Sequence, residues 1–281
     1  MLSEIRELGF LQAELSHGIR MSLVPGILRA LEEKVIEISS THNFCPLPSA
    51  VDHAAPNLFQ PSSRRRLEIS MWYRYTVRTM EFAQQVNANK IVIHSGSSPH
   101  PIFRKPLDFE GIAERSETSE FEKSLNRLRE RSKRPVARVL EQFRSVHAQA
   151  TELNLQFGVE NREGVYELPL DSEAEAFFED LPDGDTFGYW HDTGHAQLKH
   201  RLGLLDHREH LEKMSPRLIG FHLHDVSAEG RDHQVPGSGE IDFAMIREFI
   251  EPHHTLVAEL SPRLTKDEVI ASRDFLLEKL S

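Results

Sequence analysis

Most of the short apolar segments of this 281-residue chain end at or close to a histidine, an aspartate or a glutamate. These side chains are common protein ligands of divalent metal ions, and they are also common general acids and bases. The residues are His17, His42, His94, Glu160, Asp192, His195, His222, His224, His233 and Glu259. A single histidine after a strand is more often a hydrogen-bonded loop residue than a ligand. The set therefore indicates a site only if the fold brings its members together.

Three of these residues are carboxylates that a purely structural role explains poorly. Glu160 and Glu259 each lie in an apolar segment, and Asp192 follows Tyr-Trp-His. Burying an unpaired carboxylate is costly, and three in one place repel each other unless a cation lies between them. With imidazoles beside them, a divalent metal ion is the simplest explanation.

The elements that would position these residues alternate along the chain. Short Val- and Ile-rich segments predict strands at 12–16, 35–39, 90–94, 155–161, 186–191, 218–224 and 255–260. Apolar residues spaced by three and four predict helices at 2–8, 23–33, 65–86, 136–153 and 243–250. This alternation predicts a parallel sheet, since parallel strands need crossover connections. The favoured fold is an α/β (β/α)8 TIM barrel, in which active sites lie at the C-terminal ends of the strands.

Seven strands are predicted, whereas a closed barrel of this kind has eight. The chain opens in a helix that Gly9 would cap, so either a first strand lies upstream of Met1 or the barrel has a gap at that seam. A second copy of the chain could cover such a gap in a homo-oligomer. We expect one domain over residues 1–281. It includes a charged helical excursion at about 97–135, which is either a solvated helix or a lid.

Composition excludes several classes of protein. The chain has 33 Lys and Arg against 44 Asp and Glu, a net charge of −11, which argues against nucleic acid as a partner. The basic run at 64–66 opens a predicted helix and is interpreted as a solvated face. Cys45 is the only cysteine, so neither an internal disulfide nor a cysteine zinc site can form. No apolar stretch approaches the ~20 residues of a membrane span, and the first residues lack a signal-peptide pattern, so we expect a cytoplasmic protein.

The order and spacing of several motifs resemble those of the xylose isomerase-like TIM barrel superfamily. This group includes sugar isomerases and epimerases as well as the apurinic endonuclease family 2. The motifs are Glu160-Asn161, Asp192-Thr193-Gly194-His195, His222-Leu223-His224-Asp225, Pro236-Gly237-Ser238-Gly239-Glu240-Ile241-Asp242 and Glu259. The resemblance extends from Glu14 to Pro262 and is carried by the motifs together, because each is weak alone.

The resemblance implies a set of metal ligands. Four residues match the ligands of the metal site shared across the superfamily: Glu160, Asp192, His222 and Glu259. In the endonuclease branch, His42 and His94 match ligands of a second ion that Glu160 bridges. His195 and His233 match ligands of a third ion. There the branch has an aspartate two residues before the histidine, where this chain has Arg231, so the third site would lose a carboxylate.

The resemblance first implies a metal-dependent isomerase or epimerase of carbohydrate metabolism that acts on a sugar or sugar phosphate. Glu160 and Glu259 would be the paired acid and base, and Mn, Mg or Co would stabilise an enediolate. The substrate-binding residues would be His195, Arg231 and His17. For Arg231 a surface position without function is an equal alternative.

Two other functions remain open. The extra histidines favour a hydrolase or lyase with two or three Zn or Fe ions, of the apurinic endonuclease family 2 type. The other alternative is a catalytically idle barrel that binds a ligand or a partner. We rank it last, because buried carboxylates kept without a metal would destabilise the fold.

Overall fold

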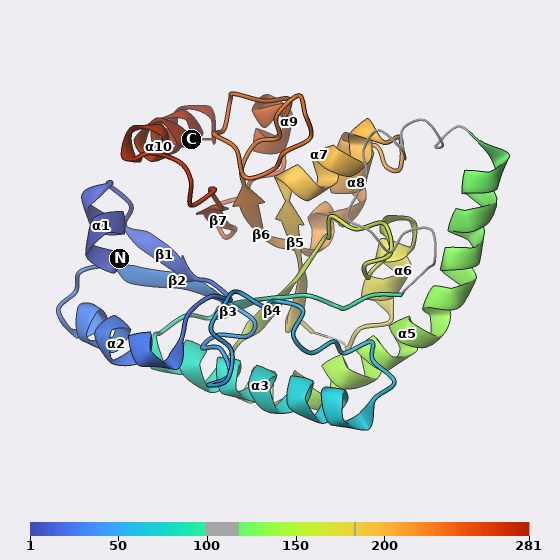
Figure 1. Ribbon diagram of the computed structural model, residues 1–281, viewed down its shortest axis with the longest axis horizontal. Helices are drawn as coiled ribbons and strands as arrows, with labels where there is room; N and C mark the ends of the chain where they lie inside the picture. The colour runs from blue at the N-terminus through green and yellow to red at the C-terminus, as the bar shows by residue number, and fades with distance from the viewer. Residues whose placement is uncertain (99–117, 183, 281) are drawn as a thin grey trace. The chain divides into compact units, whose positions relative to one another are not determined.

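The computed structural model of the protein describes residues 1–98, 118–182 and 184–280, and Figure 1 shows the order of its elements. The strands are β1 (Gln12–Leu15), β2 (Glu37–His42), β3 (Lys90–Ile93), β4 (Gln156–Glu160), β5 (Phe187–Asp192), β6 (Leu218–Leu223) and β7 (Thr255–Ala258). They form one sheet in chain order, and the pairings β1–β2, β2–β3, β3–β4, β5–β6 and β6–β7 are all parallel. The predicted parallel α/β arrangement is confirmed. Within the described residues the sheet has the seven strands that the sequence predicts.

Helices precede the first strand, connect successive strands and follow the last one. They are α1 (Leu2–Glu7), α2 (Val24–Glu32), α3 (Arg66–Gln85), α5 (Ser119–Glu152), α6 (Ala174–Glu179), α7 (Thr193–Arg201), α8 (His207–Met214), α9 (Phe243–Arg247) and α10 (Lys266–Leu280). Gly9 follows α1 with a φ of 91°, which fits its predicted role at a helix end. Asn87 and Asn154 also have left-handed backbones, with φ of 57° and 53°, and turn the chain from α3 into β3 and from α5 into β4. No helix of the described part of the chain has the length and apolar character needed to cross a membrane.

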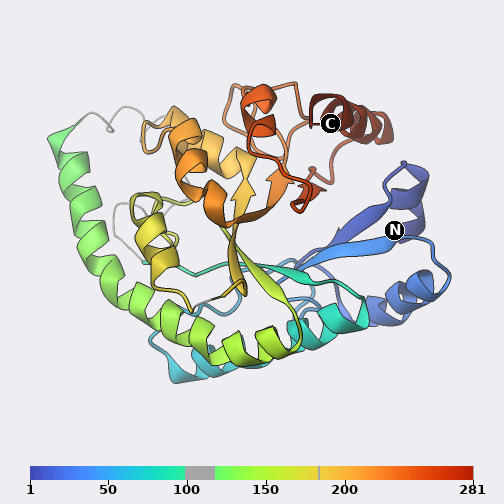
Figure 2. The ribbon, with the colours of Figure 1, turned by 180° about the vertical axis from the view of Figure 1, so that it is seen from behind.

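The chain folds into two compact units. The first contains Met1–Gly96, Arg138–Val159 and Leu181–Gly188. Its core includes a row of stacked rings: Phe143 stacks on Trp72 at 6.1 Å and on Phe187 at 5.1 Å, and Phe187 stacks on Phe157 at 5.4 Å. This packing ties α3 and the C-terminal part of α5 to β4 and β5, and the two helices lie side by side in Figures 1 and 2.

The second unit contains Ser97–Ala137, Glu160–Asp180 and Tyr189–Ser281. Trp190 of β5 is fully buried there and packs edge-on against His222 of β6, with 5.4 Å between the ring centroids. Gly220 makes this packing possible, because a Cβ at that position would lie 2.3 Å from Cζ3 of Trp190. The indole ring thus supports the strand that carries His222.

Some boundaries differ from the sequence predictions. β2 runs to His42 rather than ending at Ser39, because its polar residues are accommodated by partners: Ser40 donates to Glu14 Oε2 over 2.7 Å, and Thr41 pairs with Ile91. Helix α5 starts at Ser119 and continues through Pro135, whereas the predicted helix started after that proline. Of the predicted excursion at 97–135, residues 119–135 are therefore helical, and residues 99–117 lie outside the described residues.

Candidate metal centre

Four of the predicted metal ligands gather in the second unit at the C-terminal ends of consecutive strands. Glu160 ends β4, Asp192 ends β5, His222 lies near the end of β6, and Glu259 directly follows β7. One potential ligand atom from each residue lies within 4.8 Å of the others. Nδ1 of His222 is 2.8 Å from Oε1 of Glu160 and 2.9 Å from Oε2 of Glu259. One ring nitrogen carries at most one proton, so this single N–H lies between two carboxylate oxygens.

The charges of this group are also unbalanced. Glu160, Asp192 and His222 are buried, and the side chain of Glu259 is 28% exposed. Arg162 contacts Glu160 through Nη1, and its Nε lies 3.4 Å from Oε1 of Glu167, so this one guanidinium is shared between two carboxylates. Three carboxylates and an imidazole with a deficit of positive charge are a donor set that suits a divalent cation. These four residues therefore fit a metal ion.

The surroundings favour the ionised carboxylates that a cation requires. Burial alone would raise the pKa of Asp192, but the charge that His195 and His224 carry when protonated, together with the hydrogen bond from His224, outweighs it and lowers that pKa. In the same way, burial is outweighed at Glu259 by His222 and His233, which hold its pKa well below the usual value. Burial disfavours the charged form of Arg162, but Glu160 and Glu167 more than compensate and raise its pKa. Metal ligands must be deprotonated, so both acids are in the form that binds.

Asn161, which directly follows Glu160, makes two hydrogen bonds to the main chain of Asp192. Its Oδ1 accepts from the main-chain N–H of Asp192 over 2.7 Å, and its Nδ2 donates to the carbonyl of Asp192 over 3.0 Å. Nδ1 of His195 lies 3.0 Å from the carbonyl oxygen of Asn161, which can only accept, so His195 carries its proton on Nδ1. The Glu-Asn and Asp-Thr-Gly-His motifs are thus joined through Asn161.

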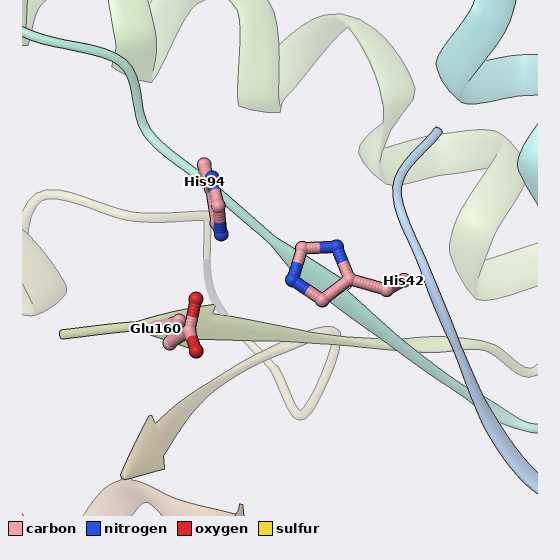
Figure 3. A group of neighbouring side chains, drawn as sticks. All are labelled: His42, His94 and Glu160. Carbon is pink, nitrogen blue, oxygen red and sulfur yellow. The ribbon is translucent and has the colours of Figure 1, made fainter. Parts of the chain in front are cut away.

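The first unit holds a row of histidines. The rings of His17 and His42 meet edge-on at 4.7 Å, and those of His42 and His94 at 4.8 Å. His42 ends β2, and His94 directly follows β3 (Figure 3). Nδ1 of His42 faces the carbonyl of Asn43 at 3.1 Å, and Nδ1 of His94 faces Oδ1 of Asn57 at 3.0 Å. In both rings the proton on Nδ1 therefore faces an oxygen, and this is the tautomer that binds metal through Nε2.

The residues of the predicted third ion are arranged differently from the expectation. His195 groups with Glu163 and Asp232, whereas His233 groups with His224 and Glu259. Burial would lower the pKa of His233, but hydrogen bonds to Asp232 and Glu259 raise it to about 11. His195 and His233 thus lie in two different candidate groups, and their binding of a third ion stays a prediction.

Arg231 lies on the surface of the protein. Its side chain is 74% exposed and pairs with Glu229, with 3.2 Å between Nη2 and Oε2. In this conformation it is a surface residue of the loop between β6 and α9. Its contact with substrate stays a prediction.

Asp225 organises the loop that follows β6. Its Oδ1 accepts from the main-chain N–H groups of Val226 at 2.8 Å and Ile241 at 3.1 Å, and its Oδ2 accepts from Gly237 at 2.8 Å and Gly239 at 3.0 Å. A Cβ at Gly239 would lie 2.1 Å from the carbonyl oxygen of Val226, so the loop closes only with glycine there. Main-chain N–H groups of the sequence motif at 236–239 therefore bind one buried carboxylate, that of Asp225.

We expect Asp225→Asn to lower the free energy of unfolding by about 2–4 kcal/mol, because an amide NH2 faces two N–H groups and leaves them unsatisfied. Urea unfolding measures this loss, and hydrogen exchange at Gly237 and Gly239 should accelerate. Asp242→Asn is the matched control, since Asp242 caps α9 with one oxygen and asparagine caps equally well. Equal stability and exchange in the two variants would contradict this role of Asp225.

Sequence reasoning missed a second polar cluster, on the other face of β5. Tyr189 Oη lies 2.8 Å from Nδ1 of His191 and 3.0 Å from Nε2 of His210. Nε2 of His191 lies 3.0 Å from Nε2 of His207, whose Nδ1 is 3.2 Å from Oε1 of Gln197. All of these side chains are buried. The available signals were the alternation of side chains along β5 and the three-residue spacing of His207 and His210 on one face of α8.

These contacts fix one pattern of protons. Gln197 Oε1 accepts from Nδ1 of His207, so Nε2 of His207 must accept from Nε2–H of His191. Nδ1 of His191 then accepts from Tyr189, which accepts from Nε2–H of His210. Each of the three histidine rings in this hydrogen-bonded series is neutral. Burial is the main cause, and it lowers the pKa of His207 to about 3, that of His191 well below its usual value, and that of His210 in the same direction.

The comparisons with known proteins agree with this geometry. Residues 2–268 match the protein-family model described as a xylose isomerase-like TIM barrel. The chain belongs to this family. The resemblance and the barrel fold expected from the sequence are thereby confirmed, and the seven described strands are those of a xylose isomerase-like barrel.

Solved structures share the fold of this xylose isomerase-like protein at low sequence identity. A D-tagatose 3-epimerase-like protein is 16% identical, with a TM-score of 0.69 over 99% of this chain and 91% of the other. D-psicose 3-epimerase from Clostridium cellulolyticum H10 is 16% identical, with a TM-score of 0.67 over 100% and 92%. The 3-keto-D-glucoside 4-epimerase from E. coli is 14% identical, with a TM-score of 0.67 over 99% and 92%. A search of curated proteins finds no match to the sequence.

Proposed function

We propose that this protein is a divalent-metal-dependent isomerase or epimerase of a sugar or sugar phosphate. The observation that carries the proposal is the convergence of Glu160, Asp192, His222 and Glu259 at the ends of four consecutive strands. These residues would hold the ion. When bound, the cation would bind neighbouring sugar oxygens and stabilise the negative charge that develops as a carbon-bound proton leaves.

Two carboxylates supply the proton chemistry. Glu160 and Glu259 approach the same nitrogen of His222 from β4 and from the end of β7, so a substrate carbon between them could lose a proton to one and regain it from the other. Glu259 is placed to act as the base, because its side chain is 28% exposed and a substrate can reach it. Glu160 is buried against Arg162, which fixes its orientation.

The structural neighbours guide the choice of substrates. Several are named as 3-epimerases of ketohexoses, and one as a 4-epimerase of a keto-glucoside. We therefore propose a small sugar with a carbonyl next to the carbon that changes configuration. His195 and His17 remain proposed substrate-binding residues. Carboxylate ligands favour Mg or Mn and an imidazole ligand adds Co, so these three metals are proposed first.

The test is proton exchange in D2O. Protein reconstituted with Mn, Mg or Co is incubated with a panel of ketoses, aldoses and their phosphates, and products are followed by NMR. We expect one substrate pair to interconvert with deuterium entering at the carbon beside the carbonyl. No exchange with any member of the panel, for protein shown to hold metal, would contradict the proposal.

A two-metal hydrolase is the second candidate, because His42 and His94 both carry the tautomer that binds metal. Two Zn or Fe ions per chain, together with cleavage of a phosphoester, would favour it. The −11 net charge of the chain still argues against nucleic acid as the substrate.

A further inference from the structure

His224 lies directly behind Asp192 in the second unit. It follows β6, is fully buried, and its Nε2 is 3.1 Å from Oδ1 and 3.2 Å from Oδ2 of Asp192. The main-chain N–H of His195 donates to the same Oδ1 over 2.7 Å. The carboxylate of Asp192 is therefore held by these two donors, and its orientation depends on them.

The protonation pattern of His224 follows from its other ring nitrogen. Nδ1 lies 2.9 Å from the main-chain nitrogen of His233, which can only donate, and a more distant 3.4 Å from the carbonyl of Asp225. Nδ1 is thus the acceptor, and the proton of the neutral ring is on Nε2, where it points at Asp192. Because one nitrogen accepts and the other donates, His224 has no lone pair for a metal ion, although it is near His233 and Glu259.

The ring is locked in this position. A Cβ at Gly194 would lie 2.0 Å from Cε1 of His224, so the ring fills the space that a side chain would take. On its other side it stacks on His233, with 4.3 Å between centroids and an angle of 5°. Oγ1 of Thr193 donates to the carbonyl of His224 over 2.8 Å.

We propose that His224 is a positioning residue, which orients Asp192 for metal binding and links it to the loop at 226–241. The link runs from Asp225, which anchors the loop, through the N–H of His233 to Nδ1 of His224, and from Nε2–H to Asp192. Hydrogen-bond partners behind a metal ligand commonly change metal affinity by about 10–100-fold. This inference rests on the proposed metal site but adds residues that the four-ligand set does not include.

The experiment measures Mn²⁺ affinity by calorimetry in four variants. We expect His224→Leu to weaken binding by about 10–100-fold, and His224→Gln, whose amide can still donate, to stay within about threefold of wild type. Gly194→Ala displaces the ring without removing it and should weaken binding in the same direction. His210→Leu is the matched control: it removes a buried histidine bonded to Tyr189, and it should lower thermal stability while leaving Mn²⁺ affinity unchanged.

A second readout needs no metal. Long-range ¹H–¹⁵N spectra of the metal-free protein at pH 8 should show His224 protonated on Nε2 alone, with its signals assigned by their loss in His224→Gln. Protonation on Nδ1 would overturn the inference, and so would Mn²⁺ affinity in both His224→Leu and Gly194→Ala within twofold of wild type. If wild-type protein bound no Mn²⁺, the proposed function would fail, and the spectra would still show whether His224 donates to Asp192.

Discussion

Glu259→Gln should lower the rate of proton exchange into substrate by about 10²–10⁴-fold, even when the metal site is saturated. An amide cannot accept the proton that the carboxylate takes from carbon. It still offers an oxygen to the ion, so added metal should restore occupancy without restoring the rate. The measurement is deuterium incorporation by NMR at increasing Mn²⁺ concentrations.

Asp192→Asn is the matched control for this prediction. Asp192 is held by the main-chain N–H of His195 and by Nε2 of His224, so it can orient the site, and it is not one of the two carboxylates that we propose exchange protons with a substrate. Its variant should lose metal affinity and regain much of its rate at high Mn²⁺. If Glu259→Gln instead recovered its rate as Asp192→Asn does, Glu259 would be a ligand and not the base.

Acid should destabilise the protein through the buried histidines of β5 and α8. Burial lowers the pKa of His207 to about 3, whereas in the unfolded chain it titrates near 6.5. The unfolded state therefore binds more protons below pH 6.5, and stability falls as the pH falls from 6.5 toward 3. His207 alone contributes about 1.4 kcal/mol per pH unit in this range, or about 2 kcal/mol at pH 5. A proton added to Nε2 would also place two N–H groups against each other, because Nε2–H of His191 already points there.

Urea unfolding at pH 7.5, 6.0 and 5.0 measures this effect. His207→Gln should have a smaller slope of stability against pH, by about 1 kcal/mol per unit, while substitution of the exposed His53 serves as the control. An unchanged slope in His207→Gln would show that this ring is already charged in the folded protein.

The sequence indicated the four-ligand site because its carboxylates interrupt apolar strands. Glu160 and Asp192 end strands that are largely buried, and Glu259 follows β7, so strand periodicity and the cost of buried charge pointed to the same residues. The parallel sheet followed from the same segments. These features depend on local patterns, which a single sequence contains.

Other features depend on contacts that local patterns do not contain. The end of β2 was missed because Ser40 and Thr41 are polar, and only the neighbouring strands show how they are satisfied. The role of Asp225 requires the loop to fold back by more than ten residues. The direction of the proton on His224 depends on a main-chain N–H nine residues away. The exposed position of Arg231 depends on the course of the loop after β6, in which it pairs with Glu229.

The central claim is that Glu160, Asp192, His222 and Glu259 hold a divalent ion. It is tested most directly by metal stoichiometry, measured by elemental analysis on protein purified without chelator or histidine tag and reconstituted with Mn²⁺. We expect one tightly bound ion per chain in wild-type protein, and loss of that ion in Asp192→Asn at the same metal concentration. No bound ion in wild-type protein after reconstitution, or equal occupancy in both proteins, would contradict it.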